Sequence, residues 1–450
     1  MRLSEVVCKD NHPEIKSMPP VLKKCADVPR LETALTGPLG PIESQLLESK
    51  PVIEDWFQTR WQETPPPFYA SVDLRNAGFK IAPVDTNLFP AGFNNLNPAF
   101  LPLCSQAVHS RIEQLKYGIR RILLVPESHT RNLSYLENVA VLKAIIENAG
   151  FEVRLGSLIP DLKTPLDIAL PSGRSVKLEP LVRQQDRVGV ADFDPDLAIL
   201  NNDLSSGIPA ILEGLAQPLV PPLAMGWSTR RKSLHFTHYQ RVAAEFSAHL
   251  GIDPWRIDPL FRDCGEIDFM KRSGEECLVH NVEVLLAAIQ RKYDAYGITS
   301  KPLVFVKADA GTYGMGVMTA YSAEEVKELN RKQRTQMATT KEGQKVTRVI
   351  IQEGVYTHET WDEAVAEPVV YLIGPCVVGG FYRVHMDKAA DENLNAPGMR
   401  FEPLSFAELP TFSGREESLS TVPDRFYAYG VIARLGLLSA AREIAELTLA

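Results

Sequence analysis

The spacing of apolar residues predicts a strand, helix and strand unit in the first half of the chain. Residues 121–125 form a short apolar run typical of a buried strand, and residues 135–149 repeat apolar positions with helical spacing. Residues 151–155 and 197–200 read as further strands. Because ligands bind at the carboxyl ends of strands in open α/β sheets, Arg131, in the loop after the first strand, is a candidate ligand contact.

Beyond residue 255 the pattern changes to strands and hairpins separated by single helices. A helix is predicted for residues 281–296, and a hairpin is predicted around Gly374-Pro375. The predicted strands comprise residues 276–279, 304–307, 317–320, 348–355, 364–373 and 376–385. The whole sequence therefore predicts the α/β class, with an open α/β domain followed by an α+β region.

Chain length sets the number of domains. A chain of 450 residues exceeds one ordinary hydrophobic core, so two or three domains are expected. We predict a helical lead-in or arm over residues 1–67, which ends in a run of prolines. An α/β domain is predicted over residues 68–255 and a second domain over residues 256–450.

Composition narrows the class of partner. The net charge is -8 and the chain has no long basic run, which argues against nucleic acid as a partner. No stretch approaches the roughly 18 apolar residues of a membrane span, and the six cysteines form no C-x-x-C pair. A reduced, cytoplasmic protein that binds small molecules is the simplest interpretation, and assembly into a homo-oligomer is left open.

A glycine-rich loop follows the predicted strand at residues 304–307. Lys307 ends the strand, and Gly311, Gly314 and Gly316 follow it. A P-loop is excluded because its lysine follows its glycines, and a dinucleotide fingerprint is excluded because here the glycine order is reversed and a strand follows. The pattern instead predicts a flap whose backbone NH groups, with the lysine, hold phosphates. The alternative is a hairpin whose glycines only allow positive φ.

A cluster of polar residues lies among aromatic residues and glycines at positions 69–95. It includes Asp73, Arg75, Asp85 and Asn87. Carboxylates bind an ammonium and arginine binds a carboxylate, so the cluster predicts a site for a zwitterion. A solvated loop is the alternative.

A second group of cations precedes a predicted helix at residues 235–250. Arg230 and Lys232 stand just before this helix, where cations oppose the helix dipole. They predict capture of a phosphate or carboxylate, and an exposed basic turn is the alternative.

Residues 391–395 concentrate oxygen ligands. Asp391, Asn393 and Asn395 alternate along the chain, so an extended segment would place their side chains on one face, with Glu392 as a competitor. We interpret them as candidate Mg²⁺ ligands, and a polar turn is the alternative.

The order of these motifs resembles the ATP-grasp ligases and, among them, enzymes of the glutathione pathway. The shared order is a strand with a lysine, a glycine flap, a strand that ends in Gln352-Glu353, a hairpin that ends near Arg383, and an acidic, asparagine-rich loop. Residues 382–385 and 393–398 look like segments of bacterial glutathione synthetases. Over nearly its full length the chain is similar to the proteobacterial type of glutamate-cysteine ligase, which we take as the leading identification.

The resemblance implies a reaction and two cofactors, ATP and Mg²⁺. The reaction would join the γ-carboxylate of L-glutamate to the amine of L-cysteine through γ-glutamyl phosphate, as the first step of glutathione biosynthesis. The first domain would bind substrate, and the second would be an ATP-grasp-like ATP-binding domain. Glutathione synthetase or another carboxylate-amine ligase is one alternative, and a non-catalytic, ATP-binding regulatory protein is another.

The resemblance also implies roles for named residues, with Arg383 and Lys307 as the catalytic pair. The predicted ATP-binding residues are Lys271, Lys307, Gly311, Thr312, Tyr313, Gly314, Met315, Gly316, Gln352, Glu353, Val355 and Glu367. The predicted substrate-binding residues are Arg75, Asp85, Asn87, Arg131, Arg230 and Lys232. The E-x-N metal motif of many ATP-grasp enzymes is missing after Gly398, so the predicted metal ligands are Asp391, Glu392, Asn393 and Asn395.

Overall fold

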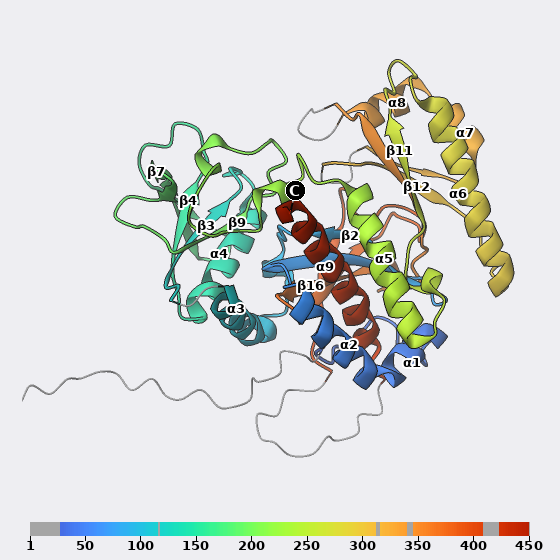
Figure 1. Ribbon diagram of the computed structural model, residues 1–450, viewed down its shortest axis with the longest axis horizontal. Coiled ribbons are helices and arrows are strands. Elements are labelled where there is room, and N and C mark those ends of the chain that lie inside the picture. The colour runs from blue at the N-terminus through green and yellow to red at the C-terminus, as the bar shows by residue number, and fades with distance from the viewer. Residues whose placement is uncertain (1–27, 116–117, 312–315, 340–344, 408–422, 450) are drawn as a thin grey trace, which may run out of the picture.

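A computed structural model describes residues 28–115, 118–311, 316–339, 345–407 and 423–449. Within this part of the chain, the strands form three larger sheets that lie one after another along the long axis of the molecule (Figure 1). Helices pack on each of them, so the predicted α/β class is confirmed. No helix of the described residues combines the length and apolar character that a membrane span requires.

The central sheet is antiparallel. Its strands are β1 (Tyr69–Asn76), β2 (Ile81–Asn87), β15 (Thr360–Trp361), β16 (Ala364–Ile373), β17 (Cys376–His385) and β18 (Arg400–Pro403). Their order is β18-β17-β16-β1-β2, with β15 paired to β16. The predicted hairpin has the predicted bounds, and Gly374 in its turn adopts the positive φ of 52° that glycine tolerates best.

The second sheet is mostly parallel and contains the predicted strand, helix and strand unit. Its strands are β3 (Arg121–Pro126), β4 (Glu152–Ser157), β5 (Leu166–Ala169), β6 (Ser175–Pro180), β9 (Leu197–Asn201) and β10 (Leu219–Val220). Their order is β10-β9-β3-β4-β6-β5, with only β5 antiparallel to its neighbour. The accompanying elements are α3 (Leu101–Leu115), α4 (Leu133–Asn148) and the hairpin of β7 (Val182–Gln184) and β8 (Arg187–Gly189). The predicted open α/β arrangement is confirmed.

The third sheet is antiparallel and carries the glycine flap. Its strands are β11 (Phe261–Glu266), β12 (Val304–Ala308), β13 (Val317–Ala320) and β14 (Arg348–Glu353). Their order is β11-β14-β12-β13, so the strand that holds Lys307 is an inner one. The helices beside it are α6 (Glu275–Tyr296), α7 (Ala323–Lys327) and α8 (Arg331–Ala338).

The strand predicted at residues 276–279 is wrong, because these residues form the first turn of α6. Leu278, Val282, Leu285 and Ile289 are all buried and recur every three or four residues. This spacing places them on one face of a single helix. The acidic residues of the first turn favour a helix start, since they oppose the positive end of the helix dipole.

The central sheet takes strands from both sides of the predicted domain bound at residue 255. The central sheet joins two strands from residues 69–87 to four strands from residues 360–403. The helices α1 (Pro41–Glu48), α2 (Lys50–Glu63), α5 (Lys232–Leu250) and α9 (Arg425–Leu449) lie together beside this sheet (Figure 1). The described part of the predicted arm therefore belongs to the same hydrophobic core as the central sheet.

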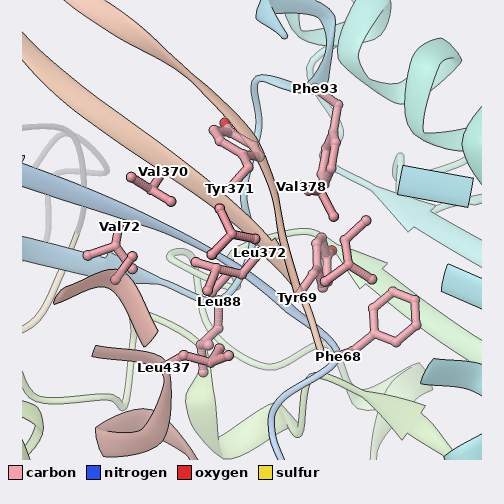
Figure 2. Packing of buried hydrophobic residues seen from close by; sticks show 14 of the residues in the cluster. Phe68, Tyr69, Val72, Leu88, Phe93, Val370, Tyr371, Leu372, Val378 and Leu437 are labelled. Atoms are coloured by element: carbon pink, nitrogen blue, oxygen red, sulfur yellow. The ribbon is translucent and has the colours of Figure 1, made fainter. Parts of the chain in front are cut away.

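This core holds α9 close against the central sheet. Figure 2 shows Leu437 of α9 beside Leu88, near Val72 of β1. At Gly436 an added Cβ would lie 2.9 Å from the hydroxyl oxygen of Thr86 and 3.6 Å from Val72, so glycine permits the close approach of the helix. A separate cluster packs α6 on the third sheet. Short 3-10 helices span Phe93–Asn95, Pro98–Phe100, Ala210–Leu212, Leu223–Met225 and Pro254–Arg256.

Candidate active site

A cavity lies between the central sheet and the third sheet. Strands of both sheets, the start of α5 and the loop after β17 contribute to its wall. Its charged and amide side chains belong to Asp73, Arg75, Asp85, Lys232, Lys307, Glu367, Arg383, Asn393 and Asn395. Its remaining lining residues are Val84, Phe305, Ala308, Gly311 and Val317. Residues from the polar cluster, the flap and the asparagine-rich loop therefore meet at one place.

The face of the central sheet that borders the cavity carries a row of opposite charges. Asp73 and Arg75 lie two residues apart on β1, and Asp85 of β2 is opposite Asp73. Glu367 of β16 is opposite Arg383 of β17. Directly opposed residues, and residues two apart on a strand, share a face of the sheet, so strand register gathers these side chains.

Arg383 is at the centre of this charge network. Its Nη1 lies 2.6 Å from Oε1 of Glu367 and 3.0 Å from Oδ2 of Asp73. Burial opposes the charge of Arg383, but the two carboxylates outweigh burial and raise its pKa. Burial raises the pKa of Asp73 despite Arg383, whereas Arg75 and Arg383 together overcome burial and lower the pKa of Glu367. The site thus keeps a charged guanidinium beside a charged carboxylate.

Arg75 attaches the loop after β17 to the sheet. Its Nε donates to Oε2 of Glu367 at 3.0 Å, and its Nη1 donates to the carbonyls of Val355 at 3.1 Å and Ala390 at 3.2 Å. Its Nη2 donates to the carbonyl of Glu392. A planar guanidinium with several fixed acceptors orients a loop more firmly than a single lysine contact does. Arg75 therefore supports the part of the loop from which Asn393 and Asn395 reach the cavity.

Lys307 reaches from the third sheet towards the central sheet. Its Nζ donates to Oε1 of Gln352 at 2.5 Å and to the carbonyl of Val84 at 3.3 Å. Burial, opposed chiefly by Asp85, lowers the pKa of Lys307 to about 8. The lysine is still mostly protonated at neutral pH, so it supplies a cation inside a buried cavity.

Lys232 adds a second ammonium to the same wall. Its Nζ lies 2.8 Å from Oδ2 of Asp85 and 3.7 Å from the centre of the Trp227 ring, a cation–π distance. Burial alone would raise the pKa of Asp85, but Lys232, with Lys307 and Arg230, lowers it to about 2. Asp85 is therefore ionised; it forms an ion pair with Lys232, and its charge also acts on Lys307.

Asp309 joins the flap to the start of α5. Its Oδ1 accepts from the Ser233 backbone NH at 2.8 Å, and its Oδ2 accepts from the Ser233 hydroxyl at 2.9 Å. Arg231 at the N-cap position makes no side-chain cap, so Asp309 takes over this role from a distant strand. Sequence analysis missed Asp309; its only signal was the unsuitable N-cap residue in front of a strong helix.

The two ends of the flap have the backbone geometry expected of glycine. Gly311 has a φ of 100° and Gly316 a φ of 67°. The Gly311 NH donates to the carbonyl of Trp227 at 3.0 Å. The predicted ATP-binding residues Thr312, Tyr313, Gly314 and Met315 lie outside the described residues.

Some predicted ATP-binding residues lie away from the cavity wall. Lys271 is exposed in the loop before α6. Glu353 is buried in an ion pair with Lys80, at 2.7 Å. Gln352 contacts the cavity through Lys307, and Val355 contributes the carbonyl that Arg75 binds. Their predicted contacts with ATP stay predictions.

Three of the predicted substrate-binding residues also do not line this cavity. Arg131 is exposed in the loop before α4. Arg230 is buried and donates from Nε to Oε1 of Glu443 at 3.0 Å, so its charge is neutralised within the protein. Asn87 bonds through its side chain to the backbone of Phe89. The cavity instead brings in Asp73, whose alternation with Arg75 is the signal in the sequence.

Two of the four predicted metal ligands are bound to other side chains, and the other two line the cavity. Asp391 accepts from the Tyr321 hydroxyl at 2.6 Å, and Glu392 pairs with Lys388 at 2.8 Å. Asn393 and Asn395 line the cavity. Across the part of the chain that the structure describes, no group of three or more histidine, cysteine or acidic side chains is arranged to hold a metal. The metal assignment stays a prediction.

The cavity between the two sheets is lined by several buried cations, and the family comparison identifies the protein as a ligase. The model of a family described as glutamate-cysteine ligase matches residues 43–444. The chain belongs to the glutamate-cysteine ligase family. Membership of this ligase family implies that the enzyme uses ATP.

A solved structure supports the same family. A protein of Methylobacillus flagellatus KT that carries the provisional name gamma-glutamylcysteine synthetase is 56% identical, with a TM-score of 0.83. The match covers 93% of this chain and 99% of that one. The relationship therefore extends over both the central sheet and the sheets beside it.

Two more distant ligase-like structures are too dissimilar to support an argument. A glutathione synthetase-like effector of Globodera pallida is 9% identical, with a TM-score of 0.35 over 80% of this chain and 79% of that one. The D-alanyl-alanine synthetase A of Vibrio cholerae is 11% identical, with a TM-score of 0.32 over 70% and 80%. No curated protein gives a significant match.

Proposed function

We propose that this chain joins the γ-carboxylate of L-glutamate to the amine of L-cysteine with ATP, through γ-glutamyl phosphate, and so begins glutathione biosynthesis. The observation that carries the proposal is that Lys307 and Arg383, from different sheets, line the same buried cavity. A carboxylate is a poor acyl donor until it is phosphorylated, and phosphoryl transfer depends mainly on positioning and on neutralising charge. Cations on opposite walls of a buried cavity suit that requirement.

The third sheet and the flap would bind the triphosphate. Lys307 stands at the end of β12, two residues before Asp309 and four before the flap glycine Gly311. Its charge would approach the phosphates while the flap NH groups cover them. Lys232, held by Asp85 beside Lys307, is the second cation available to a polyanion. Binding a phosphate there would replace the carboxylate as the partner of one lysine.

The central sheet would bind the amino acid and the transferred group. Arg383 is held by Asp73 and Glu367, so its orientation is fixed before a ligand arrives. Preorganised donors cost no rearrangement at the moment of reaction, which is the main source of electrostatic catalysis. Asp73 pairs with Arg383 alone, whereas Glu367 pairs with two arginines, so Asp73 is the acid with more capacity to bind a substrate ammonium.

The carboxylates of the cavity fit a Mg²⁺ ion that arrives with the nucleotide. Mg²⁺ in such enzymes needs one or two carboxylates, and water and phosphate oxygens supply its other ligands. Asp73, Asp85 and Glu367 offer carboxylates, and Asn393 and Asn395 offer amide oxygens. The ion would neutralise phosphate charge, and Asp391 and Glu392, which do not line the cavity, are the weaker candidates.

A substrate-dependence assay tests the proposal. The full chain is incubated with ATP and Mg²⁺, and ADP release is measured with glutamate alone, with glutamate plus cysteine, and with γ-glutamylcysteine plus glycine. We expect release that requires glutamate and cysteine together, with γ-glutamylcysteine identified by mass. Release only with γ-glutamylcysteine and glycine would assign the chain to glutathione synthesis, and ATP binding without release in any arm would indicate a regulatory protein.

A further inference from the structure

Two cysteines lie side by side outside the active site. Cys264 is on β11 and Cys277 is in the first turn of α6, and their sulfur atoms are 3.8 Å apart. Both are thiols; Cys264 is buried and Cys277 is exposed. A disulfide bond would bring these sulfur atoms to about 2 Å from each other.

The surroundings favour one of the two sulfurs as the nucleophile. The Cys264 thiol and the Asn281 side-chain amide, at 3.3 Å, both donate to Sγ of Cys277. Asn281 is itself held by Nε of Arg262 at 2.5 Å, on the same strand as Cys264. Cys277 is the exposed member of the pair, so its sulfur is the one that a small disulfide can reach. Burial raises the pKa of Cys264 to about 12, so this thiol keeps its proton while Cys277 reacts.

We propose that Cys264 and Cys277 form a thiol–disulfide exchange site that takes low-molecular-weight disulfides. The Cys277 thiolate attacks one sulfur of the small disulfide, the bond between its sulfurs breaks, and one small thiolate leaves. The released thiolate takes the proton of Cys264, and Sγ of Cys264 attacks Sγ of Cys277, which releases the second small thiolate. The protein dithiol is oxidised by two electrons and the small disulfide is reduced to two thiols.

The bond would close the loop of residues 265–276. This loop carries Lys271 and contacts the rest of the third-sheet region through Asp268, which lies 2.6 Å from Nζ of Lys345. β11 pairs with β14, and β14 pairs with the strand of Lys307. A covalent link between β11 and α6 therefore reduces the freedom of the loop at the edge of the sheet that holds Lys307.

Peptide mapping in a defined redox buffer tests the proposal. The full chain is equilibrated with reduced and oxidised glutathione in several ratios, its remaining thiols are alkylated, and its peptides are analysed by mass. We expect a linked pair of peptides, one with Cys264 and one with Cys277, whose mass is about 2 Da less than the sum of the two separate thiol peptides. A reductant should separate them again. Hydrogen exchange of residues 275–278 should slow in the oxidised protein.

Matched variants separate the roles of the two sulfurs. Cys277→Ser changes an exposed position and should leave Cys264 unmodified, whereas Cys264→Ala should accumulate a glutathione adduct on Cys277. Cys104→Ala removes another buried cysteine and should leave the pairing unchanged. A lasting adduct on Cys277 in the wild-type chain, or oxidation at other cysteines while this pair stays reduced, would overturn the proposal. The mapping does not depend on ligase activity, so the two proposals fail separately.

Discussion

Nζ of Lys307 lies 2.5 Å from Oε1 of Gln352 on the neighbouring strand β14. The same nitrogen also donates to the carbonyl of Val84 on the central sheet. Lys307 thus bridges the two walls of the proposed active site. Its protonation state controls both this bridge and the charge available to a nucleotide.

The affinity for ATP should therefore depend on pH. The pKa of Lys307 is about 8, so the ligand-free enzyme carries this charge below that pH and loses it above. Because ATP binds the protonated form, its affinity should be constant below about pH 7 and fall up to tenfold per pH unit above about pH 8. Calorimetric titration with a non-hydrolysable ATP analogue and Mg²⁺ measures this dependence.

Lys307→Arg is the matched variant for that measurement. Arginine keeps its charge throughout this range, so the inflection near pH 8 should disappear even where affinity is lower. Lys332→Arg on the exposed face of α8 should leave the wild-type profile unchanged. A wild-type affinity that is flat from pH 7 to pH 9 would show that Lys307 does not contribute its charge to nucleotide binding.

Removing the charge of Glu367 should destabilise the fold. Glu367 neutralises two buried arginines, with Oε2 3.0 Å from Nε of Arg75 and Oε1 2.6 Å from Nη1 of Arg383. Glu367→Gln leaves both guanidinium groups with less compensation, which should lower the unfolding free energy by about 3 kcal/mol. Urea unfolding followed by tryptophan fluorescence measures the change.

The control for Glu367 lies on the edge of the same sheet. Glu402 of β18 pairs with Arg400 at 3.2 Å, but both side chains are partly exposed. Glu402→Gln should cost less than about 1 kcal/mol, since solvent screens exposed pairs. Equal losses in the two variants would mean that burial does not set the strength of the Glu367 network.

Local sequence patterns predicted the elements well where the pattern and the contacts are both local. The hairpin of β16 and β17 was found with correct bounds because a turn of glycine and proline separates two long apolar runs. The start of α6 was misassigned because the four consecutive residues 276–279 are too few to show whether the apolar positions repeat as in a helix or as in a strand. Short apolar runs leave helix and strand undecided.

Contacts between distant segments could not be predicted in this way. Nothing in residues 69–76 indicates that they pair with residues 364–373, yet this pairing places Arg75 beside Glu367. Exposed Lys271 and buried Arg230 do not line the cavity, and composition alone cannot tell a ligand contact from a surface cation or an internal ion pair. The candidate site is a product of strand register, which a local pattern does not contain.

Arg75→Lys should loosen the loop that supplies Asn393 and Asn395. Lysine keeps one charge near Glu367 but cannot donate in several fixed directions to the carbonyls of Ala390 and Glu392. Hydrogen exchange of residues 389–398 should therefore become faster, by about tenfold if one net hydrogen bond of about 1.4 kcal/mol is lost. Arg400→Lys, on an exposed position of β18, is the control and should leave that exchange unchanged. Unchanged exchange in Arg75→Lys would assign the order of the loop to other contacts.

Glu359 should make the fold less stable as pH rises from weakly acidic to neutral values. The side chain is fully buried and accepts from the Tyr429 hydroxyl at 2.6 Å, and burial raises its pKa to about 7. Its unfolded pKa is about 4.3, so between these values the folded state binds more protons and the unfolding free energy falls as pH increases. Above pH 7 both states are ionised and this slope ends.

Glu359→Gln removes that proton equilibrium without changing the size of the side chain. The difference in unfolding free energy between variant and wild type should shift in favour of the variant from pH 5 to pH 8, by up to about 3 kcal/mol. Other titrating groups occur in both proteins, so their contributions cancel in the difference. Urea unfolding at the two pH values measures it, and Glu363→Gln at an exposed position should show no shift. Parallel stability profiles for Glu359→Gln and wild type would mean that this carboxyl group is already ionised in the folded protein at pH 5.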